Sequence, residues 1–87
     1  MSRPTRLTVC LHEGYPAVAA LQRMSTILSH QQVPLSELTF KPSPECGAWQ
    51  LVLETDGDAA WDLHQLVERL RREVVVRDVR TSPAARG

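Results

Sequence analysis

Residues 7–28 read LTVCLHEGYPAVAALQRMSTIL, and this stretch decides the fold because it passes from a strand pattern through a turn into a helix pattern. Apolar residues alternate with small or polar ones over residues 7–11, which predicts a half-buried strand with Leu7, Val9 and Leu11 facing inward. Gly14 and Pro16 mark the turn, because glycine permits unusual backbone angles and proline suits the first turn of a helix. The stretch therefore begins a β-α-β unit.

The predicted helix starts at Ala17 and carries one apolar stripe at the spacing of a 3.6-residue period. We expect it to end near residues 30–32, because Pro34 disfavours helical geometry at Val33. The stripe consists of Ala17, Ala20, Leu21, Met24, Ile27 and Leu28.

A hairpin is predicted next, with strands at residues 35–41 and 49–54 joined by the turn cluster at 42–47. Period-2 alternation assigns each strand an inward and an outward face. The inward residues are Ser36, Leu38, Phe40, Trp49, Leu51 and Leu53, and the outward residues are Glu37, Thr39, Lys41, Gln50, Val52 and Glu54.

A second helix is expected from Ala59, with Asp58 as its N-cap, because a carboxylate there accepts the orphan amide hydrogens of the first turn. Its apolar stripe is Ala59, Leu63, Leu66, Val67 and Leu70. The valine run at 74–76 has high strand propensity and opens a last strand over residues 74–80.

Strand–helix–strand thus occurs twice in 87 residues. We predict an α+β fold, the ferredoxin-like βαββαβ sandwich, in which a four-stranded antiparallel sheet carries two helices on one face. The first and third strands should be central. The predicted organisation is an N-terminal arm at residues 1–5, one domain at 6–80 and a flexible tail at 81–87.

Charge and cysteine content limit the function classes. Ten basic and ten acidic residues balance, which argues against non-specific electrostatic binding to nucleic acid or anionic lipid. No apolar run is long enough for a membrane span, and the N-terminus leads into no signal-peptide core. Cys10 and Cys46 form no metal-ligand spacing. We therefore expect a cytoplasmic protein with two reduced thiols.

Two places could carry function. Residues 13–18 join a central strand to a helix N-terminus, where free amides and the helix dipole favour a carboxylate or phosphate, although Gly14 and Pro16 could simply shape a tight turn. The uncovered sheet face should be lined by Thr8, Cys10, Gln50 and Val52. That face could pair with another subunit or be solvated.

The sequence pattern does not indicate a catalytic role. His12, His30 and His64 are scattered, so no catalytic, metal or cofactor site is expected. Trp49 and Trp61 are expected in core or interface packing. An RNA-recognition domain would need aromatic residues on the open face of the central strands, and none is expected there. A phosphatase of similar topology would need an arginine in the turn and an asparagine, but the turn has no arginine and the chain has no asparagine.

These residues resemble a stand-alone ACT domain, and most of all the small regulatory subunit of acetolactate synthase (acetohydroxyacid synthase). The resemblance extends from about residue 6 to 80 and rests on three segments. They are the turn Gly14-Tyr15-Pro16-Ala17-Val18, the strand Val33-Pro34-Leu35-Ser36-Glu37-Leu38-Thr39 and the final Val74-Val75-Val76-Arg77-Asp78-Val79.

The resemblance implies a non-catalytic regulatory subunit that forms a homodimer and activates the catalytic large subunit of a thiamine-diphosphate enzyme. It implies a small amino-acid effector, of the branched-chain class, held by Gly14, Tyr15, Pro16, Ala17 and Val18. Gly14 stands where the family often has asparagine, and Ala17 where it often has glycine, which leaves effector sensing open. The alternative is a generic amino-acid-binding ACT module that regulates another enzyme or regulator.

Overall fold

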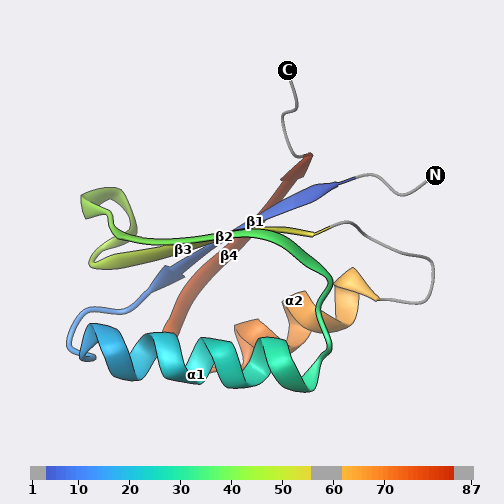
Figure 1. The fold of residues 1–87 in the computed structure, drawn as a ribbon. Coiled ribbons are helices and arrows are strands. Elements are labelled where there is room, and N and C mark those ends of the chain that lie inside the picture. The colour runs from blue at the N-terminus through green and yellow to red at the C-terminus, as the bar shows by residue number, and fades with distance from the viewer. Residues whose placement is uncertain (1–3, 56–61, 84–87) are drawn as a thin grey trace.

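The computed structural model describes residues 4–55 and 62–83 and has the predicted α+β, ferredoxin-like βαββαβ order (Figure 1). Short loops connect most of these elements, and a single 3₁₀ turn, η1, lies between the second and third strands. The elements are β1 (Thr5–Leu11), α1 (Ala17–His30), β2 (Leu35–Pro42), η1 (Pro44–Cys46), β3 (Trp49–Thr55), α2 (Leu63–Arg71) and β4 (Val76–Pro83).

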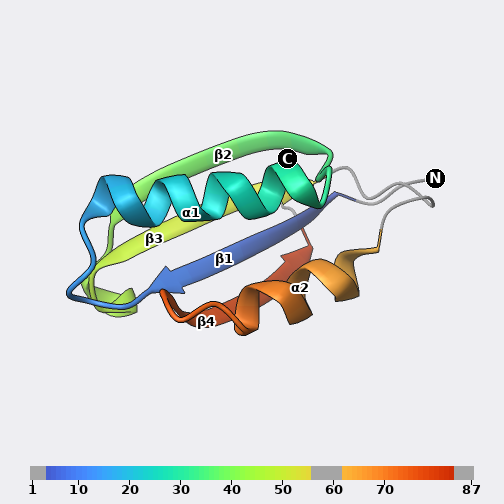
Figure 2. The ribbon, with the colours of Figure 1, turned by 90° about the horizontal axis from the view of Figure 1, so that it is seen from below.

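The four strands form one antiparallel sheet in the order β2-β3-β1-β4, so β1 and β3 are central as predicted. Leu7 of β1 lies opposite Leu53 of β3, and Val9 lies opposite Val79 of β4. Figures 1 and 2 show both helices on the same face of the sheet, with α1 over the β2–β3 side and α2 over the β4 side. Within residues 4–55 and 62–83, neither α-helix lies on the other face.

The core lies between the sheet and the helices, where most of the predicted inward positions of β1 and β3 are buried. The predicted inward face of β2 is wrong for Ser36 and Leu38, which are exposed because β2 lies at the edge of the sheet. Leu7, Val9 and Leu53 are fully buried, and fully burying side chains of this kind stabilises a fold by about 1.5–3 kcal/mol each. Phe40 and Trp49 pack against this core and stack with ring centroids 4.8 Å apart, as expected for Trp49. Trp61 lies outside the described residues. The helices contribute Ala20, Met24, Ile27, Leu28, Leu66 and Leu70.

The last strand is displaced from its predicted position. β4 begins at Val76, and Thr81, Ser82 and Pro83, which we expected in a tail, continue it opposite Leu7, Arg6 and Thr5. The reason is that β1 itself begins at Thr5, so the backbone groups at its start need a partner strand. The valines at 74 and 75 lie in the turn before β4 instead.

The second helix begins at Leu63 in the described residues. Its N-cap is Asp62, whose carboxylate accepts hydrogen bonds from the amides of His64 and Gln65 at 3.0 and 3.4 Å. An aspartate caps this helix for the physical reason given for Asp58. Asp58 and Ala59, where we expected the helix to begin, lie outside the described residues.

The prediction of two reduced thiols is wrong in this structure. Cys10 of β1 and Cys46 of η1 form a disulfide, with their Cα atoms 5.0 Å apart. The β2–β3 hairpin brings η1 back beside β1, although 36 residues separate the two cysteines in sequence. Among the described residues, no helix combines the length and apolarity that a membrane span requires.

Candidate functional site

The predicted site begins at the turn between β1 and α1. Gly14 has a φ of +93°, a conformation that side chains with a Cβ rarely adopt, so glycine has a backbone role here. Pro16 is the N-cap of α1, and its carbonyl accepts from the Ala20 amide at 3.0 Å. Within the described chain no side chain caps this end, so the first-turn amides keep their capacity to bind an acceptor.

The five predicted effector residues do not converge on one cavity. Gly14 and Pro16 are exposed and Ala17 is half-buried. Val18 is 68% exposed and points to the surface. Tyr15, 40% exposed, is the one of the five that lines a pocket found in the described part of the molecule. The predicted turn is thus present in the structure. Of its five residues, Tyr15 lines the pocket.

That pocket lies between the first half of α1 and the turn that precedes β4. Its volume is about 160 Å³ and its surface is mostly apolar. Val74 is 75% exposed at this place, which leaves an apolar side chain in solvent. The lining residues are Tyr15, Ala19, Ala20, Arg23, Glu73, Val74 and Val75.

Local hydrogen bonds hold the turn before β4 in place. The Glu73 amide donates to the Leu70 carbonyl at 3.0 Å, and the Val76 amide donates to the Glu73 carbonyl at 3.0 Å. The His12 amide donates to the Val75 carbonyl at 2.9 Å. This last bond ties the turn directly to the end of β1, so both walls of the pocket are anchored to the same central strand.

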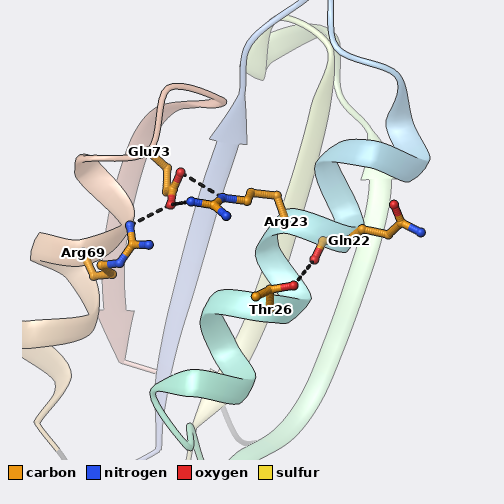
Figure 3. Close-up of polar contacts among 5 residues, drawn as sticks. All are labelled: Gln22, Arg23, Thr26, Arg69 and Glu73. Atoms are coloured by element: carbon orange, nitrogen blue, oxygen red, sulfur yellow. Dashed lines mark hydrogen bonds and ion pairs between the residues drawn. The ribbon is translucent and has the colours of Figure 1, made fainter.

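Glu73 joins the two helices at the base of this region (Figure 3). Its carboxylate is only 8% exposed and accepts hydrogen bonds from Arg23 of α1, at 3.1 Å from Nε and 2.8 Å from Nη2. Arg69 of α2 donates a further bond of 2.6 Å from Nη1. One carboxylate thus faces two guanidinium groups, which gives the cluster a net positive charge.

This pairing sets the protonation of the cluster. The hydrogen bond from Arg23 lowers the pKa of Glu73, outweighing the opposing effect of burial, with the bond from Arg69 adding to the decrease. The same hydrogen bond raises the pKa of Arg23. Glu73 is therefore an ionised structural link rather than a proton donor at neutral pH.

Sequence reasoning missed residues 73–75 as part of this site. The consecutive valines have high strand propensity, and the sequence alone gave no reason to place two of them in a turn. The available signal was Glu73, a carboxylate placed directly after a helix end rich in arginine, where a salt bridge back onto the helix is favourable.

The uncovered sheet face contains a second hollow, polar and about 300 Å³ in volume. Thr8, Gln50 and Val52 line it, as predicted. Cys10 does not, because the disulfide partner covers it and leaves it buried. The other lining residues are Arg6, Glu37, Thr39, Lys41 and Glu54, with Arg6 and Glu54 in a 2.9 Å ion pair.

Neither hollow assembles a recognisable reaction centre. Across residues 4–55 and 62–83, no group of three or more histidine, cysteine or acidic side chains is arranged to hold a metal ion. The pocket beside α1 offers apolar contacts next to the Arg23–Glu73 ion pair, and the hollow on the sheet offers mixed charges. Both arrangements can bind a partner or a small molecule.

Comparison with known proteins adds no relative. A scan of the sequence against protein-family models gave no match, and a search of curated proteins found no similar sequence.

Proposed function

We propose that this chain is a non-catalytic regulatory subunit, similar to the small subunit of acetolactate synthase, that binds and activates a catalytic large subunit in the cytoplasm. The observation that carries the proposal is the apolar pocket between the start of α1 and the turn before β4. It adjoins the β1–α1 turn, where ACT domains are expected to act. The βαββαβ order of the described elements is consistent with that family.

The pocket suits a small apolar group. An apolar cavity of about 150 Å³ accepts a molecule the size of benzene, so a branched aliphatic side chain is of suitable size. The uncapped first turn of α1 would favour the carboxylate of the same ligand. A Cβ built on Gly14 meets no atom within 4 Å, so the missing asparagine side chain leaves open space beside the turn. These features support a branched-chain amino acid as effector.

The rim of the pocket supports binding of a larger partner. Tyr15 and Val74 are exposed hydrophobic residues that line the pocket from its two sides. A grouped set of apolar side chains in solvent is characteristic of an interaction surface. We assign this rim, defined as Tyr15 and Val74, to contact with the catalytic subunit.

A second copy of the chain would use another surface. β2 is an edge strand that pairs with β3 alone, and Leu35 and Leu38 on it are each about two-fifths exposed. Edge strands of this kind extend a sheet readily. The proposed subunit is therefore a homodimer whose copies leave the pocket and its rim free for the large subunit.

Regulation would follow from different affinities for two states of the catalytic subunit. A coupling free energy of about 1–3 kcal/mol is typical between an effector site and an active site. The chain would need no reactive group for this role, because it acts by biasing an equilibrium that the large subunit already has.

Co-expression with thiamine-diphosphate-dependent large subunits tests the proposal. We expect a complex on size-exclusion chromatography and a higher catalytic rate than the large subunit shows alone. Absence of both would refute the assignment.

A thermal-shift screen with leucine, valine, isoleucine and non-branched amino acids tests the effector. A response to a non-branched amino acid without any complex would favour a generic amino-acid-binding module.

A further inference from the structure

The Cys10–Cys46 disulfide lies outside the hydrophobic core. The core cluster occupies the helix-covered side of the sheet, and neither cysteine belongs to it. Cys10 instead shares the uncovered side with Thr8, two positions along β1. The bond therefore fastens the η1 turn to the outside of the central strand, while the core and the β1–β3 ladder are complete without it.

Among the described residues, most hydrogen bonds of the η1 turn stay within its own hairpin. The hydrogen bonds of Ser43, Cys46 and Gly47 amides join residues within the β2–β3 connection. Toward β4, the Cys46 carbonyl accepts one hydrogen bond from Arg77 Nη1 at 3.0 Å. Arg77 lies at a bulge, where β4 shifts register between the partners of Cys10 and Leu11. Without the disulfide, the hydrogen bond from Arg77 would still join η1 to β4.

The turn also lies beside the start of the functional region. A Cβ built on Gly47 would lie 2.5 Å from Arg77 Nη1 and 3.9 Å from Glu13 Oε1. Glu13 directly precedes Gly14, the positive-φ residue that shapes the β1–α1 turn. A displacement of η1 would thus change the surroundings of the segment that leads to Tyr15.

We propose that the Cys10–Cys46 disulfide is a redox-sensitive latch that holds the η1 turn against β1 and is opened by a dithiol reductant. A thiolate of the reductant attacks one sulfur, forms a mixed disulfide, and its second thiol then displaces the cysteine. Two electrons and two protons pass to the protein, giving two thiols, and the reductant becomes a disulfide. This inference uses the cytoplasmic location in the proposed function, because disulfides in that reducing compartment are typically transient or redox-sensing.

Both sulfurs are shielded, since Cys46 is buried within η1 and Cys10 is buried on β1, so attack requires a local opening of η1. Reduction then removes the covalent bond that limits this opening. The oxidised form holds the turn across the end of the uncovered face, and the reduced form releases it, with the helix-covered core left folded.

Limited proteolysis with a glutamate-specific protease tests the latch on the whole chain. Glu45 lies in η1, and its following peptide bond reports opening of the turn. Glu68 lies within α2, and its following bond reports unfolding of the domain. Both cleavages are quantified by mass spectrometry after complete reduction of the products, in protein incubated with or without dithiothreitol.

We expect dithiothreitol to speed cleavage after Glu45 about tenfold or more while cleavage after Glu68 changes much less, because proteolysis follows the population of the open form. The double variant Cys10→Ser/Cys46→Ser should behave as the reduced form and ignore dithiothreitol. Equal acceleration of cleavage at both bonds would overturn the latch, because it would show that the disulfide stabilises the whole domain. No acceleration at Glu45, or two titratable thiols in air-oxidised protein, would also overturn it. None of these readouts involves the catalytic subunit, so the proposed function can fail separately.

Discussion

The two faces of the sheet share the same strands but differ in the burial and the polarity of their side chains. On the helix side, Leu51 and Leu53 of β3 are fully buried in a continuous apolar core. On the other side, their neighbours Gln50 and Val52 line a polar, open hollow. Alternation along a single strand thus separates the residues that determine the fold from residues that are free to meet a partner.

The largest effect should come from adjacent substitutions on opposite faces of β3. Leu53→Ala removes a fully buried side chain and should lower the free energy of unfolding by about 3 kcal/mol. Val52→Ala, one residue away on the uncovered face, should cost less than about 1 kcal/mol. Urea denaturation measures both. Similar losses would show that the uncovered face is also part of a packed core.

Two glycines sharpen the comparison at the turns. Gly47→Ala should cost about 2 kcal/mol, because its φ is +104° and the added methyl meets Arg77. Gly14→Ala should cost about 1 kcal/mol, since only its positive φ opposes alanine and the space around it is open. Thermal unfolding ranks the pair, and a greater loss at Gly14 would contradict the packing described for η1.

On the covered side, the buried Glu73 carboxylate pairs with Arg23 and Arg69, and the effect of this pairing on stability should depend on pH. Glu73→Gln should lower stability by about 1.5 kcal/mol at neutral pH, where the carboxylate accepts charged hydrogen bonds from two arginines. Because folding lowers the pKa of Glu73, its contribution is fully present above the ordinary value of 4.5 and is lost as pH falls through the lowered folded pKa.

Urea midpoints of wild type and Glu73→Gln from pH 3 to 7 would follow this loss. The two curves should converge at the acidic end. The matched control is Glu68→Gln, because Glu68 is half-exposed and its ion pair with Arg72 is 4.0 Å long, so its effect should be within about 0.5 kcal/mol. A pH-independent difference for Glu73→Gln would contradict the pairing in Figure 3.

The smallest effect tests how α2 begins. Asp62→Ala removes the side chain that accepts two amide hydrogen bonds and should cost about 1 kcal/mol. Asp62→Asn keeps the accepting oxygen and should recover most of the loss. Circular dichroism during thermal unfolding measures both variants. An unchanged midpoint for alanine would indicate that another residue caps the helix.

Alternation and helical spacing were sufficient to predict the sheet order and most of the core. Leu7, Val9 and Leu53 follow a two-residue period that has one physical interpretation, a half-buried strand. The disulfide was not predictable in this way, because pairing of Cys10 with Cys46 depends on how the hairpin returns over β1.

The candidate site was predicted only in part. The β1–α1 turn was located from Gly14 and Pro16, whose backbone preferences are local. The wall formed by Glu73, Val74 and Val75 was missed because tertiary contacts outweighed the strand propensity of valine there. Local chemistry thus identified one residue of the pocket, Tyr15, and the other lining residues required the packing of α1 against the turn before β4.

The central claim is that the rim beside α1, rather than the uncovered sheet face, meets the catalytic subunit. The most direct measurement is the rate of a thiamine-diphosphate-dependent large subunit titrated with wild type, Val74→Asp and Val52→Asp. Both variants place one charge on the surface, but on different faces. We predict activation by wild type and Val52→Asp and its loss with Val74→Asp. Activation that survives Val74→Asp and disappears with Val52→Asp would contradict the account.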